Sequence, residues 1–317
     1  MGEPVPWRAA WTEALYGTRG FYRAGAGPAA HFRTSVHASP LFADAVLRLV
    51  REAGLNTVVD LGAGGGELLV SLRRQAPDLR LYGVDVGLRP ADLPAAIEWT
   101  VEVPYFDGLL LANEWLDNIP CDVVEGTPAG PRLVLVEPAG RECLGEPPAS
   151  PDAAWLDRWW PLPSGQRAEV GLARDAAWAG AVGRLGRGLA IAVDYAHGRG
   201  SRPAQGSLAG YRGGRRVAPV PDGSCDLTAH VALDACAAAA PGSVLLTQRA
   251  ALHALGVSGR RPALGTAGYA AALQAASEAA ELTDPGGLGG FGWLVHAKGI
   301  ALPATFTTAR EATAAPG

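Results

Sequence analysis

A glycine-rich turn between an apolar run and a helical pattern is the feature that most constrains this chain. Residues 58–61 (VVDL) lead into residues 62–66 (GAGGG), and apolar residues then resume with helical spacing from Leu68. A strand, a tight turn and a helix in this order form the place where an α/β sheet holds a nucleotide-like ligand. Glycine suits the turn because a backbone without Cβ atoms can bend sharply and lie against the ligand.

The spacing of these glycines discriminates between two classes of ligand. Gly62, Gly64 and Gly66 give the pattern G-x-G-x-G, whereas a dinucleotide fingerprint needs its third glycine at position 67, which is Glu67. The spacing therefore favours S-adenosylmethionine (SAM) over NAD. The loop amides and the helix N-terminus favour an anionic group of the ligand. Asp60 is expected to orient these amides or the ammonium group of the ligand.

Composition and charge exclude several classes of partner. The chain has 317 residues, of which 48% are hydrophobic and 18% charged, as is typical of a globular protein with a substantial core. A net charge of −4 offers no general basic surface to nucleic acid, and no apolar run approaches the ~20 residues of a membrane span. We therefore expect neither nucleic acid nor a membrane as a partner. Lys298 is the only lysine among the 27 basic residues.

Four cysteines bear on the compartment and on metal binding. They form no C-x-x-C pair, and no His/Cys cluster has zinc spacing. We expect free thiols in a reducing cytoplasm and no metal site. The beginning of the sequence lacks the apolar core of a signal peptide, which favours the same location.

Strands and helices are predicted to alternate along the chain. Ser39 and Pro40 open a helix as N-cap and first-turn residue, and Gly54 closes it. The predicted strands are 57–61, 81–86, 97–103, 108–112, 189–195 and 291–298. Other predicted helices are 7–16, 166–185, 228–239, 247–255 and 266–281. The alternation implies a mostly parallel sheet that binds its ligand outside the carboxyl ends of the strands.

Other segments are predicted to lie outside this sheet. Residues 121–126 and 132–137 read as a hairpin in an insertion or cap, and 17–38 and 138–152 read as loops. The long Gly/Arg/Pro stretch 196–225 suggests a loop that serves a site. The predicted layout is an N-terminal cap and helix (1–56), a ligand-binding domain (57–302) with insertions around 121–165 and 196–285, and a disordered tail (303–317).

Asp85 ends the second predicted strand, 19 residues after Gly66. A carboxylate at this place can accept both ribose hydroxyl protons of an adenosine. The alternative is a solvated aspartate at a strand end. With the glycine loop on the preceding strand, we expect Asp85 and the neighbouring Val86 to contact the cofactor.

A second polar segment follows the fourth predicted strand. Two acids and two amides occur within residues 113–118, among them Asn113, Glu114 and Asp117. Methyl transfer from a sulfonium requires an acceptor held in line, and carboxylates match the fork of a guanidinium acceptor. Glu114 and Asp117 are therefore candidate catalytic residues, and Asn113 is a candidate cofactor contact. The alternative is that Asn113 or Asp117 caps a following helix.

A third candidate segment is residues 226–231 (DLTAHV), which follow the long Gly/Arg/Pro stretch. Asp226, Thr228 and His230 are candidate acceptor contacts. Asp226 could equally cap a helix, and His230 could be a structural histidine.

The chain resembles the MidA-type SAM-dependent methyltransferases, whose mitochondrial members are complex I assembly factors with protein-arginine methyltransferase activity. The likeness rests on several short motifs. These are residues 20–22 (GFY), 27–28 (GP), 32–35 (FRTS), 39–42 (SPLF), 60–66, 112–120 (ANEWLDNIP), 194–195 (DY), 226–231, 247–248 (TQ) and 282–285 (LTDP). The block 112–120 is the most specific of them.

The resemblance implies a Rossmann-like class I SAM-methyltransferase core with an N-terminal and inserted helical and loop cap. It implies SAM as cofactor and a protein arginine as acceptor, and Thr34 and Ser35 would close over the cofactor. The implied cofactor contacts are Asp60, Gly62, Ala63, Gly64, Gly66, Asp85, Val86, Asn113, Thr34 and Ser35. The implied acceptor side holds Glu114, Asp117, Asp226, Thr228 and His230.

Two other functions stay open at this point. One is a small-molecule O- or N-methyltransferase, which needs a closed pocket where a protein substrate needs an open groove. The other is a non-catalytic SAM-binding assembly factor, which binds the cofactor without turnover.

Overall fold

The structure is a computed structural model that describes residues 3–24, 35–263, 265 and 268–314. Its contacts divide the chain into two compact units, each assembled from three separate segments. We call residues 33–115, 181–194 and 240–317 the central-sheet unit, and residues 1–32, 116–180 and 195–239 the hairpin unit.

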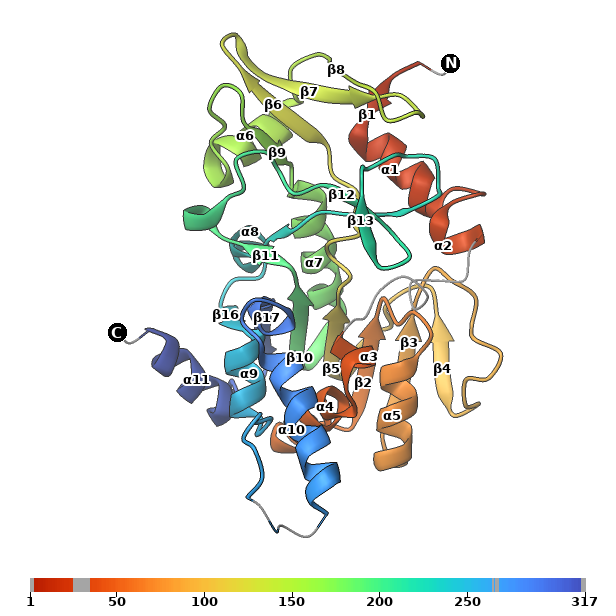
Figure 1. The fold of residues 1–317 in the computed structure, drawn as a ribbon, viewed down its shortest axis with the longest axis vertical. Coiled ribbons are helices and arrows are strands. Elements are labelled where there is room, and N and C mark those ends of the chain that lie inside the picture. The colour runs from red at the N-terminus through yellow and green to blue at the C-terminus, as the bar shows by residue number, and fades with distance from the viewer. Residues whose placement is uncertain (1–2, 25–34, 264, 266–267, 315–317) are drawn as a thin grey trace. The chain divides into compact units, whose positions relative to one another are not determined.

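The central-sheet unit is built on seven strands in the order β16-β17-β10-β5-β2-β3-β4 (Figure 1). Five neighbouring strands, from β10 to β4, are parallel, whereas β17 runs antiparallel to both β10 and β16. The bounds are β2 Thr57–Leu61, β3 Arg80–Val84, β4 Ile97–Thr100, β5 Phe106–Asn113, β10 Leu185–Asp194, β16 Val244–Thr247 and β17 Gly292–Lys298. The predicted α/β fold with a mostly parallel sheet is confirmed.

Helices accompany this sheet. They are α3 Ser35–Ala38, α4 Pro40–Glu52, α5 Glu67–Gln75, α9 Gln248–Ala254, α10 Tyr269–Thr283 and α11 Ala304–Ala314, with a 3-10 turn, η3, at Leu288–Gly290. The start of α4 is as predicted, because the Ser39 hydroxyl accepts the backbone N–H of Leu41 at 3.1 Å. Gly54 ends this helix region in the left-handed conformation, at φ 62°.

The hairpin unit contains smaller sheets and short helices. The predicted hairpin is present as β6 Val123–Thr127 and β7 Gly130–Val136, in a sheet of order β1-β7-β6-β9 with β8 on β7. Its helices are α1 Trp7–Tyr16, α2 Phe21–Ala24, α6 Ser150–Trp159, α7 Leu172–Arg184 (whose last turn belongs to the central-sheet unit) and α8 Leu233–Ala239. Its other elements are β1 Val5–Pro6, β8 Glu142–Leu144, β9 Arg167–Glu169, β11 Ala196–His197, η2 Arg199–Ser201, β12 Ala209–Arg212, β13 Arg215–Val217, β14 Asp226–Thr228 and β15 Val231–Ala232.

The core of the hairpin unit is aromatic on the side of α1. Trp7 and Trp11 are fully buried, and they pack with the inward face of the hairpin and with Leu227 of β14. The Trp11 indole N–H donates to the Leu227 carbonyl at 3.0 Å. A buried tryptophan retains its hydrogen bond in this way, so α1 is fixed to β14.

Several predicted boundaries are wrong. The predicted loops 17–38, 138–152 and 196–225 contain α2, α3, β8, the start of α6, β11, η2, β12 and β13. Residues 244–247, predicted inside an insertion, form an edge strand of the central sheet. These strands are short and mix polar with apolar residues, so they lack the alternation that marks a longer strand.

Within the tail predicted to be disordered, residues Ala304–Ala314 form helix α11, so the prediction is wrong for this part. Phe306 is fully buried, and its ring lies 6.1 Å from that of Trp293 on β17. The Thr305 hydroxyl donates to the carboxylate of Glu52 at 2.6 Å. One aromatic anchor thus orders a segment whose composition is otherwise small and polar. In the described part of the chain, no helix combines the length and the apolar character that a membrane span needs.

Candidate functional site

The glycine loop joins β2 to α5 in the central-sheet unit. Gly62, Gly64 and Gly66 all have left-handed backbones, with φ values of 76°, 55° and 79°. The N–H groups of Gly62 and Ala63 both donate to the Val84 carbonyl, at 2.9 and 3.3 Å. A Cβ on Gly62 would come within 3.0 Å of the Trp115 ring, so this side chain lies directly against the loop. The geometry is that of a backbone cradle which side chains would fill.

Asp85 immediately follows β3 and holds the loop from the neighbouring strand. Its Oδ2 accepts the N–H of Gly64 at 2.9 Å, and its Oδ1 accepts the N–H of Gly87 at 2.7 Å. A carboxylate has about four acceptor positions, so both oxygens retain capacity for ribose hydroxyls. Asp85 therefore orders the loop, and its contact with the ribose stays a prediction. Val86, the next residue, is 49% exposed, as a side chain available to a ligand would be.

Asp60 lies at the end of β2 with 5% of its surface exposed. Burial, together with the nearby charges of Asp85 and Glu67, raises the pKa of Asp60 to about 8. The carboxyl is therefore mainly protonated at neutral pH in the protein alone. A cationic ligand at the loop would favour its ionised form, which suits the positively charged groups of SAM.

Glu67 and His37 form an ion pair at the start of α5 that the sequence did not indicate. Their Oε1 and Nε2 atoms are 3.2 Å apart. The hydrogen bond to Glu67 raises the pKa of His37, although burial opposes it. Burial is the largest influence on Glu67 and raises its pKa, but the hydrogen bond and the charge of His37, together with backbone N–H groups of the loop, outweigh burial, so the pKa is lowered. The pair therefore fixes α3 beside the glycine loop.

Glu114 is the main backbone outlier of the structure. It is the one non-glycine residue with positive φ, 54°, within the described part of the chain. Its N–H donates to the Val193 carbonyl at 2.8 Å, and its Oε1 accepts from Asn113 Nδ2 at 3.1 Å and from the Ser35 N–H at 3.4 Å. Such a conformation costs about 1–3 kcal/mol and persists only where its surroundings impose it, typically at functional sites.

Gln248 contacts Ser35, the residue whose backbone N–H donates to Glu114. The sequence did not indicate Gln248 as a site residue. Its amide is fully buried at the start of α9. Its Nε2 donates to the Ser35 hydroxyl and to the Leu282 carbonyl, at 3.1 and 3.2 Å, and its Oε1 accepts from the Trp293 indole at 3.2 Å. The 247–248 and 282–285 motifs thus meet at one buried amide, next to the residue that contacts Glu114.

Asp117 and Asp226 lie together in the hairpin unit. Asp117 Oδ2 accepts the Thr228 hydroxyl at 2.6 Å, and both Asp226 oxygens accept the Tyr22 hydroxyl at 3.2 Å. Burial raises the pKa of Asp117. Burial, and then the charge of Asp117, raises the pKa of Asp226 to about 8. Two adjacent buried carboxyl groups resist joint ionisation, so the cluster retains a proton near neutral pH.

The helix-cap alternatives for these residues are wrong. Asn113 ends β5, residues 114–122 form no helix, and Asp226 begins strand β14. His230 is stacked on Tyr195, with ring centres 5.5 Å apart, and burial lowers its pKa. The backbone N–H of His230 donates to the Ser207 hydroxyl at 2.9 Å.

Arg174 is a further residue that sequence reasoning missed. Its guanidinium is 1% exposed and donates to four carbonyl groups in two neighbouring loops. These are the carbonyls of Asp117, Ile119, Ala229 and His230, at 2.8 to 3.2 Å. Arg174 therefore joins the 112–120 and 226–231 motifs through their backbones. No local pattern indicates this, because the partners are about 55 residues away in sequence.

The predicted site residues fall into two groups. Asp60, Gly62, Ala63, Gly64, Gly66, Asp85, Val86, Asn113, Glu114 and Ser35 belong to the central-sheet unit. Asp117, Asp226, Thr228 and His230 belong to the hairpin unit. Thr34 lies outside the described residues. The described residues contain no group of three or more His, Cys, Asp or Glu side chains arranged to hold a metal ion.

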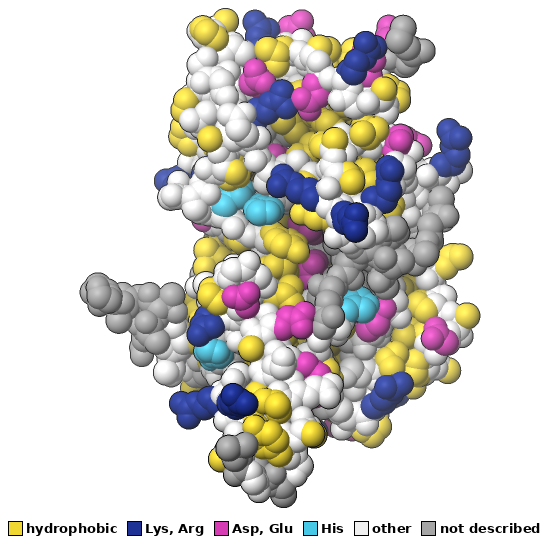
Figure 2. Space-filling model, viewed as in Figure 1, with side chains coloured by type: hydrophobic (Ala, Val, Ile, Leu, Met, Phe, Trp, Pro, Cys, Tyr) yellow, Lys and Arg dark blue, Asp and Glu magenta, His cyan; other side chains and the backbone are white. Residues whose placement is uncertain are grey.

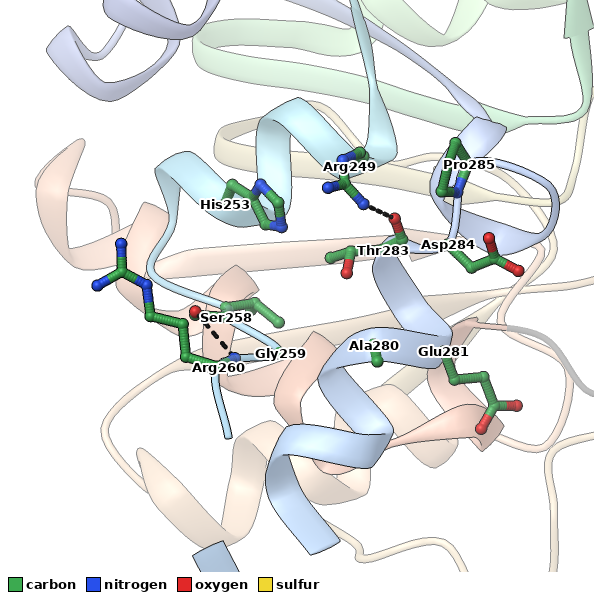
Figure 3. A pocket seen from close by; sticks show the side chains of 11 residues that line it. Arg249, His253, Ser258, Gly259, Arg260, Ala280, Glu281, Thr283, Asp284 and Pro285 are labelled. Carbon is green, nitrogen blue, oxygen red and sulfur yellow. Dashed lines mark hydrogen bonds between the residues drawn. The ribbon is translucent and has the colours of Figure 1, made fainter. Parts of the chain in front are cut away.

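A separate hollow of about 1090 Å³ lies between α9 and the end of α10 (Figure 3). The Arg249 guanidinium points across it and donates to the Thr283 carbonyl at 2.7 Å. None of the predicted cofactor or acceptor residues is among the described residues that line it. On the face seen in Figure 2, basic and acidic side chains are interspersed rather than gathered by sign.

Comparisons with known proteins agree with this geometry. The family model described as "Putative S-adenosyl-L-methionine-dependent methyltransferase" matches residues 41–247. A COG1565 superfamily member from Burkholderia thailandensis, bound to S-adenosyl-homocysteine, has the same fold with a TM-score of 0.79 and 24% identity, over 95% of this chain and 90% of that one. A native structure of a COG1565 superfamily protein from the same organism has a TM-score of 0.77 and 24% sequence identity. The match covers 95% of this chain and 89% of that one.

Among curated proteins, an uncharacterized protein of Mycoplasma pneumoniae is 34% identical over 86 residues. The match spans 26% of this chain and 19% of that protein, so it concerns only a small part of the relative. The family match, in contrast, covers more than half of the chain and includes the glycine loop, Asp85, Glu114 and the 226–231 motif. The chain therefore belongs to this family of SAM-dependent methyltransferases.

Proposed function

We propose that the protein transfers a methyl group from SAM to an arginine side chain of another protein, with Glu114 as the carboxylate that binds the guanidinium. The observation that carries the proposal is the strained Glu114, at φ 54° beyond the carboxyl end of β5. β5 pairs directly with β2, the strand that leads into the glycine loop. The carboxylate therefore belongs to the same edge of the sheet as the cofactor cradle.

The residues of the central-sheet unit fit both halves of such a reaction. SAM, when bound, supplies an electrophilic methyl group on a sulfonium. The glycine loop and Asp85 would bind the adenosine and amino-acid ends, while Glu114 holds one guanidinium nitrogen toward the methyl group. Asn113 and Ser35 already fix one oxygen of Glu114, which limits the freedom of the carboxylate. Glu114 can also accept the proton that the nitrogen loses as its new bond to carbon forms.

A carboxamide at position 114 provides the decisive experiment. Glu114→Gln keeps the shape of the side chain but removes its charge, so S-adenosylhomocysteine should bind normally while methyl transfer to arginine-containing proteins falls at least about 100-fold. Glu98→Gln, at an exposed position of β4 in the same unit, is the matched control and should keep full activity. The measurement is radiolabel transfer from SAM, followed by identification of methylarginine. Equal activity of the Glu114 variant and the control would refute the assigned role.

The same assay distinguishes the other possible functions. Transfer to small alcohols or amines but not to proteins would replace the arginine assignment with a small-molecule O- or N-methyltransferase. Tight binding of S-adenosylhomocysteine without transfer to any acceptor would favour a non-catalytic SAM-binding assembly factor. Contacts of Asp117, Asp226, Thr228 and His230 with the acceptor remain predictions, which a raised KM in their variants would support.

We also propose that the protein works in the cytoplasm and belongs to the MidA branch of its family. The four cysteines all lie in the described part of the chain, and no disulfide joins them. Three of them are buried, as structural thiols in a reducing compartment would be.

A further inference from the structure

The amino ends of the parallel strands form a second hollow in the central-sheet unit. It measures about 670 Å³ and is lined by the first residues of β2, β3, β5 and β10, by the last residue of β17 and by the last turn of α7. The glycine loop follows the opposite, carboxyl end of β2. Five residues of extended strand separate the two ends, a length of about 16 Å. We call this hollow the basal cavity.

Basic residues dominate the lining of the basal cavity. Arg80, Arg184 and Lys298 line it, and Asp107 is the one carboxylate among the described lining residues. Within the described part of the chain, neither Arg80 nor Lys298 forms an ion pair. Arg184 approaches Glu102 at 3.8 Å, but that glutamate is 86% exposed, and such surface pairs contribute little. The described residues that line the cavity therefore carry an excess of positive charge.

Two tyrosines orient the arginine side chains, one through its ring and one through its hydroxyl. The Arg184 guanidinium lies over the Tyr105 ring at 4.6 Å, and Arg80 Nη2 donates to the Tyr82 hydroxyl at 3.0 Å. These contacts orient a cation but leave its charge available. A guanidinium fixed in this way loses little side-chain entropy when an anion binds.

Lys298 is the third basic residue of the basal cavity and lies at the end of β17. Its Nζ donates to the Val182 carbonyl at 3.3 Å in the last turn of α7. An ammonium group has three donors, so two remain for a ligand. Thr57 and Asn56 add neutral polar groups at the start of β2.

We propose that the basal cavity binds a small anion that carries a chain of phosphates, such as an oligophosphate or the phosphate end of a nucleotide. Three cations on three different elements (β3, α7 and β17) suit several negative charges along one molecule better than a single carboxylate. The volume lies within the usual range of small-ligand sites. Tyr82 and Tyr105 are among the lining residues, and aromatic rings can stack on a base. The inference does not depend on the methyltransferase assignment, because the cavity shares no residue with the cofactor cradle.

The single lysine makes this site directly measurable. An amine-reactive ester can modify only Lys298 and the N-terminal amine, and peptide mass spectrometry separates the two. Tripolyphosphate should slow the modification of Lys298 at least about fivefold, saturably, without slowing that of the N-terminus. Sodium chloride at equal ionic strength should not reproduce the effect, because screening alone is not site-specific. Equal slowing of both amines, or no slowing, would overturn the proposal.

Variants of the cavity arginines, and ATP as a second ligand, identify which part of an anion the basal cavity binds. Arg80→Gln and Arg184→Gln should each weaken tripolyphosphate binding about tenfold by calorimetry, whereas Arg74→Gln, in the last turn of α5, should not. ATP is titrated with saturating S-adenosylhomocysteine present, which excludes binding of its adenosine at the cofactor loop. ATP that binds tighter than tripolyphosphate indicates a nucleotide, and equal affinities indicate the phosphate chain alone. Citrate that binds as tightly as tripolyphosphate would refute the assignment to phosphate.

Discussion

At the scale of single residues, the backbone strain of the described structure is concentrated at Glu114, which has a φ of 54°. A β-carbon in the left-handed region is disfavoured by about 1–2 kcal/mol, and glycine escapes that cost. Every other described residue with positive φ is in fact a glycine. A glutamate in this position therefore indicates that its side chain serves the function of the protein, at the expense of stability.

This strain can be measured by comparing two truncations. Glu114→Gly and Glu114→Ala both remove the carboxylate and its bonds to Asn113 and Ser35, but only glycine relaxes at φ 54°. We expect the glycine variant to be about 1 kcal/mol more stable than the alanine variant by urea denaturation, with both inactive. A more stable alanine variant would show that the backbone at this position is unstrained.

Asp60 should make stability depend on pH. The pKa of this carboxyl is about 8 in the folded protein against 3.8 as its ordinary value, so the folded state holds more protons between these limits. Stability is therefore full below about pH 4 for this group and declines as the pH rises through 8, by at most about 1.4 kcal/mol per pH unit. Denaturation of Asp60→Asn between pH 5 and 8 should give a flatter profile than the wild type. Parallel profiles would assign the dependence to other groups, such as Asp226.

At the scale of elements, the sequence predicted what regular patterns encode. The bounds of β2 and α1 were predicted to the residue, because a buried apolar run and an amphipathic turn pattern are local signals. The short strands β12 to β15 were missed, since two to four mixed residues show no clear alternation. In addition, β14 and β15 pair with β12 and β11, which lie well before them in sequence. Asp85 was predicted as a cofactor residue, but its hold on the Gly64 amide depends on strand pairing that no local pattern shows.

The contacts among α3, α9 and α10 also depend on residues distant in sequence, and they lead to a prediction about Gln248. Gln248→Ala would leave the Trp293 indole, the Ser35 hydroxyl and the Leu282 carbonyl without their buried partner. We expect a loss of about 2–4 kcal/mol in the free energy of unfolding.

An exposed glutamine provides the control for this variant. Gln274→Ala removes one surface hydrogen bond to Glu278 on α10 and should cost less than about 0.5 kcal/mol. Chemical denaturation measures both variants. Similar losses at the two positions would show that the buried amide contributes nothing special.

At the scale of the whole molecule, ligand binding should stabilise the native state. S-adenosylhomocysteine at 100 times its dissociation constant adds about 2.7 kcal/mol, which is visible as a rise in Tm. NAD should give no rise, because Glu67 puts a carboxylate where a dinucleotide loop has its third glycine. Asp85→Ala should reduce the rise, since the loop amides lose their acceptor. A rise with NAD alone would overturn the cofactor assignment.

The interleaved order of the two units has a consequence for biosynthesis. β5 ends at residue 113, but β10, its neighbour in the sheet, begins only at residue 185. At ribosomal speeds of about 5–20 residues per second, the open edge of β5 waits roughly 4 to 14 s for its partner. Throughout that interval the nascent chain presents an apolar, unpaired strand edge, which favours aggregation. Efficient production of this protein should therefore depend on chaperones that bind nascent chains, even though the finished sheet leaves β5 covered on both sides.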